Sequence, residues 1–361
     1  MTNWTVSPLS NLVTQNVESS LVLAIAQVVL GLVLVAAFLT VTVIALGYAE
    51  RKIAAHFQCR LGPMRVGWHG TLQMIADSIK LVMKEGIVPL KADKLLYFLS
   101  PFLCTLTAVL GLIIVPLSPS LQISDMNLGV FYVLAISGFG VLGILLGGWG
   151  SNNKWSLIGA MRAGAQIISY ELSVTLAVLV IVLFTGSLRL TDIVQSQAEG
   201  WWIWRAPVSG LISFCLFIVA STAEINRTPF DLAEGESELT AGYHTEYSGI
   251  TFAYFMLAEY VNLFVVAAIG STLFLGGWMP FHIGSFSAFN NIMDIIPPGL
   301  WFAAKSTFLV FLLMWFRWTF PRLRVDQLMK LEWKIFLPLG LMNLLLAAVM
   351  SLFGFYFFPL K

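Results

Sequence analysis

Four ionisable side chains lie inside strongly apolar stretches of the sequence: Glu171, Glu259, Lys305 and Arg162. At the centre of a membrane such a side chain is unfavourable by roughly 2.5 to 3.5 kcal/mol on insertion scales, so each is a candidate functional residue. Glu224, at the end of another apolar stretch, extends the series. Desolvated carboxyls of this kind can gain and lose protons near neutral pH. The residues therefore predict a proton path in a membrane domain.

A structural alternative is that these charges form ion pairs that fix helix packing, for example Glu171 or Glu259 with Lys305. Arg162 and Glu171 are nine residues apart, which places them on opposite sides of a straight helix, so they cannot pair with each other. Each needs a partner on another helix. The simplest expectation for Arg162 is that its long side chain extends to the membrane surface.

The segment 224–249 is an acidic loop between two apolar blocks. It contains a single basic residue, Arg227, and six acidic residues: Glu224, Asp231, Glu234, Glu236, Glu238 and Glu246. Such a run is usually a solvated, flexible loop. However, Phe230, Leu239 and Tyr247 interleave with the acids, and a disordered acidic segment is poor in such residues. We therefore expect a folded loop whose crowded carboxylates respond to a nearby change of charge.

The composition identifies the elements that must position these residues. Of 361 residues, 58% are hydrophobic and 11% are charged, whereas soluble domains have about a quarter charged residues. A soluble globule is therefore excluded. Most of the apolar blocks reach the roughly 20 residues that span a bilayer as a helix. The eight blocks are 21–48, 95–117, 128–148, 157–185, 207–223, 250–275, 298–318 and 335–358. We predict an all-α polytopic membrane protein with eight transmembrane helices, in a single membrane domain over residues 1–361.

Charge and cysteine content exclude other classes of protein. The formal net charge of +1 is too small to attract nucleic acid electrostatically. Cys59, Cys104 and Cys215 stand far apart without a Cys-x-x-Cys motif, so we predict neither an iron–sulfur cluster nor structural zinc on this chain.

The basic residues predict the orientation. Fifteen Lys and Arg fall in the loops after the first, third, fifth and seventh blocks, and three fall on the opposite side. Because short cytoplasmic loops are enriched in Lys and Arg, we expect these four loops inside and both termini outside.

The inner loop 49–93 contains a short amphipathic pattern. The apolar residues Leu72, Ile75, Ile79 and Val82 recur at helical spacing with polar residues between them, which predicts a surface helix of about four turns between the first and second spans. This helix would either rest at the lipid headgroups or wall a cavity at the membrane surface.

A long, ordered set of residues resembles one family. The run AEINRTPFDLAEGESEL at 223–239, followed by Gly242-Tyr243 and Glu246-Tyr247, closely resembles the signature of the quinone-chamber membrane subunit of respiratory complex I. In bacteria this is the H subunit, and in mitochondria it is subunit 1 of NADH dehydrogenase. Further matches include ERK at 50–52, ISYE at 168–171, AEY at 258–260 and PRLR at 321–324. Met64 and Val325 depart from the family pattern.

The resemblance implies a chain that docks a hydrophilic arm on its inner face and forms a narrow quinone chamber with two arm subunits. Candidate chamber residues are Arg51, Gln58, Arg60, Asp77, Phe230, Arg322 and Arg324. Taken singly, each arginine is equally well explained as an ordinary positive-inside residue. Candidate proton-coupling residues are Glu171, Glu224, Asp231, Glu234, Glu236, Glu238 and Glu259.

The resemblance also implies partners and a location. Quinone is the substrate, while FMN and iron–sulfur clusters belong to partner subunits, and antiporter-like membrane subunits lie beside this chain. We expect no redox centre or metal on this chain itself. A bacterial plasma membrane is favoured over a mitochondrial inner membrane.

Three other functions compete with this interpretation. A stand-alone proton or cation transporter often has repeated halves, and no internal repeat is seen here. The related membrane subunit of a membrane-bound hydrogenase is disfavoured by the complete ESEL run at 236–239 with Glu246-Tyr247. A purely structural membrane anchor leaves the intramembrane glutamates unexplained.

Overall fold

The structure is all-helical, as predicted. The computed structural model describes residues 21–233, 235–283 and 286–354, and every regular element within these ranges is a helix. Seven helical segments of the described chain are long and apolar enough to cross a membrane. They are Val33–Phe57 of α2 (Leu21–Phe57), α4 (Lys94–Ile113), α5 (Gly129–Gly150), α6 (Lys154–Thr185), α11 (Ile250–Phe274), α13 (Pro298–Thr319) and Val325–Phe353.

The fifth predicted span is α9 (Ser209–Glu224), which has 16 residues. At 1.5 Å per residue it is about 24 Å long, shorter than the roughly 30 Å hydrocarbon layer. The eighth begins earlier than predicted, since α14 (Val325–Leu331) continues through a π-helical turn, η3 (Glu332–Phe336), into α15 (Leu337–Phe353). Glu332 precedes the apolar block in the sequence but is fully buried in the structure. Residues 355–358 of this block lie outside the described ranges.

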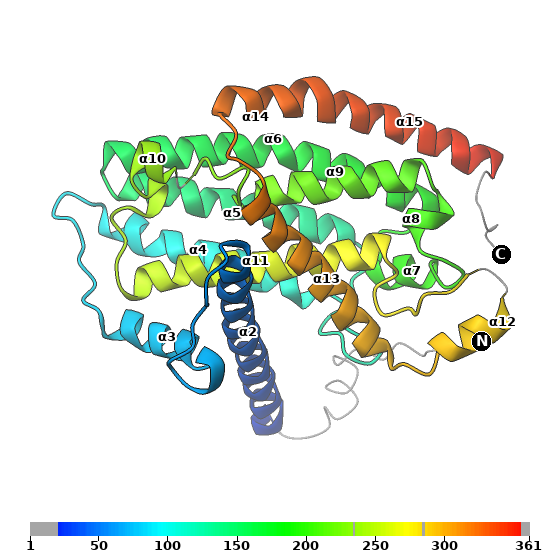
Figure 1. The fold of residues 1–361 in the computed structure, drawn as a ribbon, viewed down its shortest axis with the longest axis horizontal. Helices are drawn as coiled ribbons and strands as arrows, with labels where there is room; N and C mark the ends of the chain where they lie inside the picture. Colours follow the sequence, from blue (N-terminus) through cyan, green and yellow to red (C-terminus); the bar gives the residue numbers. More distant parts are fainter. Residues whose placement is uncertain (1–20, 234, 284–285, 355–361) are drawn as a thin grey trace.

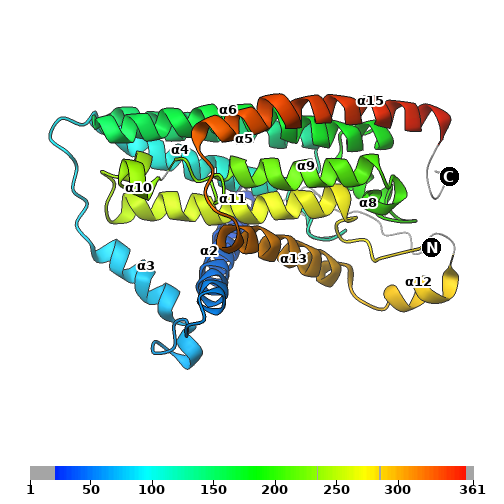
Figure 2. The ribbon, with the colours of Figure 1, turned by 45° about the horizontal axis from the view of Figure 1, so that its top comes forward.

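The long helices form one bundle. Helices α4, α5, α6, α9, α11 and α15 run alongside one another, whereas α2 and α13 cross this row obliquely (Figures 1 and 2). α3 (Gln73–Met83) and α10 (Glu236–Leu239) lie at one end of the bundle, and α7 (Leu190–Gln195), α8 (Trp202–Arg205) and α12 (Ser287–Met293) lie at the other (Figure 1). We call the first of these the α3 end of the bundle and the second the α7 end.

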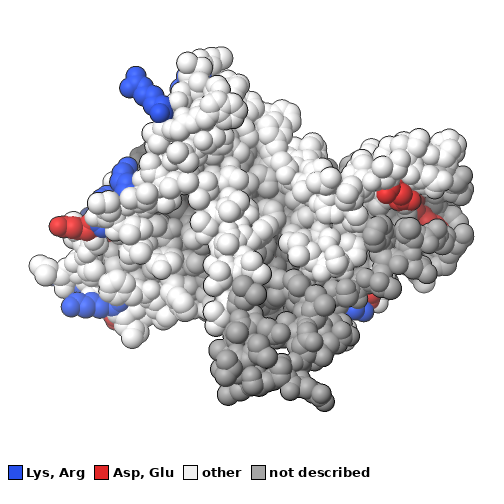
Figure 3. Space-filling model, turned by 90° about the horizontal axis from the view of Figure 1, so that it is seen from below, with Lys and Arg blue, Asp and Glu red and all other residues white. Residues whose placement is uncertain are grey.

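The surface agrees with a membrane-embedded bundle. In Figure 3, charged side chains gather toward the two ends, and the broad described surface between them carries none on this face. Large apolar side chains such as Phe131, Leu142 and Leu345 are at least half exposed within the chain, at 64%, 50% and 69%. Exposure of this extent is favourable against lipid and unfavourable against water.

Helix starts follow local sequence signals. The side chain of Asp93 accepts hydrogen bonds from the backbone N–H groups of Leu95 and Leu96, at 3.0 and 3.4 Å, and caps α4. Asn153 caps α6 in the same way through the N–H of Trp155, at 2.9 Å. An Asp or Asn at the N-cap satisfies backbone donors that have no partner inside the helix. These two residues therefore fix where α4 and α6 begin at the α3 end.

Small residues allow α5 to pack closely against α4. A Cβ atom at Gly143 would lie 2.5 Å from Sγ of Cys104, and one at Gly147 would lie 2.5 Å from Oγ of Ser100. Glycines four residues apart on one helix face let two backbones approach, which is a common way of packing helices in membranes.

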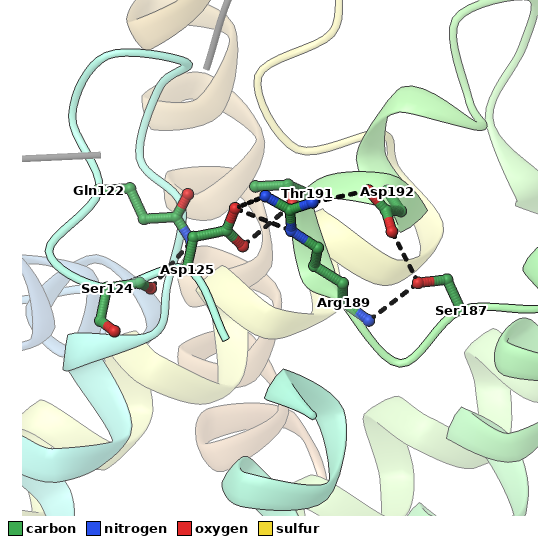
Figure 4. Close-up of polar contacts among 7 residues, drawn as sticks. All are labelled: Gln122, Ser124, Asp125, Ser187, Arg189, Thr191 and Asp192. Atoms are coloured by element: carbon green, nitrogen blue, oxygen red, sulfur yellow. Dashed lines mark hydrogen bonds and ion pairs between the residues drawn. The ribbon is translucent and has the colours of Figure 1, made fainter. Parts of the chain in front are cut away.

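A polar network ties the loops together at the α7 end (Figure 4). Arg189 forms an ion pair with Asp125, whose side chain is 3% exposed, and the hydroxyl of Thr191 donates to the same carboxylate at 3.1 Å. Ser187 donates to Asp192 at 2.8 Å. The segment before α5 is thereby joined to the segment that begins α7.

The amphipathic helix between the first two spans is present as α3. None of its residues is buried within this chain, and Ile75, Ile79 and Val82 are 40%, 54% and 66% exposed. Met74 is one of the α3 residues in contact with α2, since a Cβ atom at Gly47 would lie 2.4 Å from its Cε. An apolar face thus remains open at the α3 end.

Candidate functional site

A buried ionic cluster joins four segments of the chain. The guanidinium of Arg227, on the loop after α9, lies 3.0 Å from Glu50 of α2 and 2.9 Å from Glu259 of α11. Arg317 of α13 also pairs with Glu50 and lies 4.0 Å from Glu259. The Arg227 side chain is 1% exposed, and its guanidinium carbon lies 5.5 Å from the centre of the Tyr260 ring. Burial opposes the charge of Arg227, but Glu259 and Glu50 outweigh it and keep its pKa above the ordinary value.

The alternative ion pairs with Lys305 do not form. Glu259 is engaged by Arg227, and the ammonium of Lys305 donates instead to the carbonyl oxygens of Gly277 and Met279, at 3.0 and 2.6 Å. It also lies 4.5 Å from the centre of the Trp201 ring. Lys305 and Glu259 are therefore held at different levels of the bundle by different neighbours.

Arg162 of α6 pairs with Glu238 of the acidic loop. Its guanidinium donates to Glu238 at 2.6 Å, because α10 folds back over the start of α6. This hydrogen bond and the nearby Arg322 and Arg324 hold the pKa of the Glu238 carboxyl below its usual range, against a smaller opposing effect of desolvation. Both side chains are partly exposed, at 31% and 52%, so the pair contributes little to stability.

The acidic loop packs against the bundle. Phe230, Leu232 and Leu239 are 3%, 3% and 2% exposed, and the Phe230 ring lies 5.4 Å from that of Tyr170. The amide of Gln166 on α6 donates to the carbonyl oxygens of Ala223 and Phe230, both at 2.7 Å, and to the side chain of Asn226 at 3.1 Å. One buried side chain thus fixes both ends of the segment 223–230.

The sequence-predicted coupling residues divide into three sets. Glu171, Glu224 and Glu259 lie inside the bundle, whereas Asp231 and Glu238 lie on the loop with partly exposed side chains. Glu234 and the side chain of Glu236 lie outside the described part of the chain.

A cavity of about 140 Å³ lies between α4, α5, α6, α9 and α11. Glu224 and Glu259 line it, together with Ser137, Asn226 and other residues. Glu224 faces Ser137 of α5. Glu171 reaches the neighbouring turn of α5, because its Oε1 lies 3.0 Å from where a Cβ atom would stand at Gly138. The three glutamates of α6, α9 and α11 are therefore gathered around one interior region.

The predicted chamber residues form two groups. In the first, Arg51 of α2 forms an ion pair with Asp77 of α3, and Arg60 donates to Gln58 at 2.6 Å. In the second, Phe230 lies beside the segment 322–324, since the N–H of Leu323 donates to the carbonyl oxygen of Pro229 at 3.0 Å. Arg322 and Arg324 belong to that segment. None of the seven residues lines the interior cavity.

The two chamber groups flank the ionic cluster. Glu50 precedes Arg51 in α2, and Arg227 lies three residues before Phe230. The ion pair between Glu50 and Arg227 therefore connects the backbone segments that carry the two groups.

Comparison with known proteins identifies the family. The family model described as NADH dehydrogenase matches residues 30–348. The chain is 50% identical to the H subunit of NADH-quinone oxidoreductase from Phocaeicola vulgatus, over 96% of this chain and 97% of that protein. It is 51% identical to the H subunit from Bacteroides fragilis strain ATCC 25285, over 95% and 96%, and 49% identical to that from Bacillus cytotoxicus, over 84% and 87%.

The chain belongs to the family of NADH-quinone oxidoreductase H subunits. The resemblance inferred from the acidic loop is confirmed. The chain is therefore a membrane-embedded subunit of an enzyme complex of the respiratory type, and other subunits of that complex are its partners.

Several buried polar residues of this membrane subunit received no role from the sequence. Glu50 and Arg317 complete the ionic cluster, Gln166 holds the loop, and Glu332 is buried between α14 and α15. A signal for Glu50 existed, since Arg227 is the one basic residue of an acidic, partly apolar loop. An arginine buried in such a loop requires carboxylate partners. Gln166 and Glu332 gave no comparable signal.

His244 adds a pH-sensitive group to the acidic loop of this oxidoreductase subunit. The side chain is 9% exposed, and its ring lies 4.8 Å from that of Tyr243 and 5.5 Å from that of Phe252. Burial lowers its pKa from 6.5 to about 4, because a charged imidazolium loses hydration in this aromatic environment.

We expect His244 to make the loop acid-sensitive. Between pH 6.5 and about 4 the unfolded loop binds a proton that the folded loop does not, so stability falls as the pH falls. The loss is about 2 kcal/mol at pH 5. In protease-protection measurements on the purified complex between pH 7.5 and 5, His244→Gln should therefore protect the loop at pH 5 better than the native residue does. Equal acid sensitivity of the two forms would show that His244 is not the cause.

Proposed function

We propose that this chain forms the membrane side of a quinone chamber and the acidic path that couples quinone reduction to proton translocation in NADH:quinone oxidoreductase. The proposal rests mainly on the position of Glu259. It is a member of the ionic cluster with Arg227, and it also lines the interior cavity that contains Glu224. A change of charge near the cluster would therefore act directly on a carboxylate that borders the cavity.

The proposed mechanism is electrostatic. FMN and iron–sulfur clusters of partner subunits would supply the electrons for quinone reduction at the α3 end, where Arg51 and Arg322 would stabilise the developing negative charge. The added charge weakens the hold of Arg227 on Glu50 and Glu259. Glu224, which lines the same cavity as Glu259, and the neighbouring Glu171 then change their proton occupancy. This change passes to antiporter-like subunits beside this chain.

The arrangement of the two ends supports an orientation. α3, α10 and the loop 224–249 share one end, and the loops with most of the basic residues lead to that same end. We place the α3 end on the inner side of a bacterial plasma membrane, where it faces the hydrophilic arm. The termini then lie on the outer side. The exposed apolar face of α3 would then border the passage through which the isoprenoid tail of quinone enters from the bilayer.

Photolabelling of the assembled complex tests the chamber. A quinone analogue with a photoreactive azido group on its headgroup should attach to this chain within the segments 49–93 or 320–324, because both carry candidate chamber residues. Excess unreactive quinone should suppress the labelling. Peptide mapping by mass spectrometry gives the site. Competition-sensitive labelling that falls only on other subunits would contradict the proposed chamber and favour a purely structural anchor.

A further inference from the structure

A second polar feature lies on the face of α6 that turns toward α14 and α15. Gln166, Ser169, Tyr170 and Ser173 are spaced three and four residues apart, which places them on one side of a helix. They are 1%, 5%, 0% and 0% exposed. The α6 residues that line the interior cavity are different ones, namely Ile167, Val174 and Val178. The four residues of this polar stripe therefore do not line the cavity of Glu224.

The stripe begins at the acidic loop and ends at a buried carboxyl. Gln166 donates to Asn226 and to the carbonyl oxygen of Phe230. Seven residues further along, about 10 Å deeper by helical rise, the hydroxyl of Ser173 lies 2.5 Å from Oε1 of Glu332. Between them, the hydroxyl of Tyr170 donates to the carbonyl oxygen of Leu328 at 3.0 Å.

Glu332 occupies an unusual position for a charged residue. It is 0% exposed, and no ion pair joins it to a basic residue in the described chain. Its Oε2 has no hydrogen-bond partner among the described residues. The titratable side chain that faces it from α6 is that of Tyr170. A buried carboxylate without a cation is unfavourable by several kcal/mol, and binding a proton removes this cost.

The local backbone also distinguishes this position. Glu332 begins the π-helical turn Glu332–Phe336, which joins α14 to α15. π-helical turns are rare and frequently occur at functional sites. Here the turn directs the carboxyl toward Ser173 rather than toward lipid.

A groove of about 480 Å³ gives access to the start of the stripe. It lies between α6 and α14 and is lined by Met161, Arg162, Gln166, Met329 and other residues. Arg162 marks its opening at the α3 end, where it pairs with Glu238. Inside the groove, the sulfur of Met329 lies 4.0 Å from the hydroxyl of Ser169. Gln166 is the stripe residue that lines this groove, whose other polar lining residue is Arg162.

We propose that Glu332 is a second proton-exchanging group, loaded from this groove along the stripe of Gln166, Ser169, Tyr170 and Ser173. The proton comes from water in the groove, is held by the carboxyl of Glu332, and returns by the same route. Glu332 takes up this proton when negative charge increases at the acidic loop, because Gln166 is hydrogen-bonded to that loop. The inference rests on the proposed function, to which it adds a carboxyl on the opposite face of α6 from Glu171.

Glu332→Gln in the assembled complex, reconstituted in vesicles, tests this inference. The amide keeps the shape of the side chain but cannot exchange a proton. We expect the infrared difference spectrum upon quinone reduction to lose one carboxylic-acid carbonyl band. We also expect the rate of proton pumping to fall about tenfold, less than the loss expected for an obligatory acid–base group. Glu332→Asp should restore both, and Glu199→Gln at the α7 end is the matched control.

Two comparisons separate the possible outcomes. If Glu332→Gln matches Glu199→Gln in both measurements while Glu224→Gln stops pumping, the inference fails and the proposed function stands. If Glu332→Gln, Glu199→Gln and Glu224→Gln all leave pumping unchanged, the inference and the proposed function both fail. Should Glu332→Gln not assemble, Ser173→Ala provides the second test, because loss of its hydroxyl should shift the frequency of the same carbonyl band. An unshifted band would overturn the inference.

Discussion

Replacing Glu224 with glutamine will abolish proton pumping by the assembled complex, and replacing Glu171 with glutamine will do the same. Both carboxyls approach adjacent residues of α5, at Ser137 and Gly138, and Glu224 lines the interior cavity. Glutamine fills the same volume but neither binds nor releases a proton. The expected loss is at least about 100-fold in the pumping rate, since removing a positioned acid–base group usually costs this much.

The measurement is NADH-driven quinone reduction and acidification of vesicles that contain the purified complex. Glu199→Gln is the control, because this glutamate lies at the α7 end, where its side chain is 30% exposed and 3.8 Å from Arg205, and it does not line the interior cavity. Quinone reduction should fall together with pumping if the two processes are tightly coupled. Full activity and full pumping in both the Glu224 and the Glu171 variants would exclude the proposed relay.

Arg227→Met will destabilise the chain by about 3 to 5 kcal/mol, because it leaves Glu50 and Glu259 buried with only part of their negative charge compensated. The Glu50 side chain is 7% exposed and that of Glu259 is 20% exposed. Arg317 contacts Glu50 but lies 4.0 Å from Glu259, so it cannot replace Arg227. The cluster joins α2, α11 and α13 to the acidic loop, and its loss should loosen all four.

The effect is measured as the unfolding temperature of the detergent-solubilised complex. A second measurement is the fraction of this chain that remains in the complex. Arg60→Met is the matched control, since Arg60 is exposed and bonds locally to Gln58. The double variant Arg227→Met with Glu259→Gln should recover part of the loss, because it removes one of the uncompensated charges. If Arg227→Met unfolds at the same temperature as Arg60→Met, the cluster does not stabilise the fold.

Much of the architecture follows from local sequence. Apolar blocks near the length of a bilayer predict the long helices, because an unpaired backbone cannot be left in lipid. The recurrence of Leu72, Ile75 and Ile79 predicts α3. Asp93 and Asn153 mark the helix starts by capping, which needs only neighbouring residues. The sequence of the acidic loop also predicts the family, which the relatives confirm.

The sequence by itself therefore determined where the long apolar helices lie and that charges inside them require partners, since both depend on neighbouring residues and on the cost of burying charge. The tertiary structure alone decided the partners. Glu259 meets Arg227 rather than Lys305, Arg162 meets Glu238, and Glu332 meets Ser173. These pairs join positions 32, 76 and 159 residues apart. They depend on the relative rotation and vertical offset of packed helices, which periodicity within one helix does not encode.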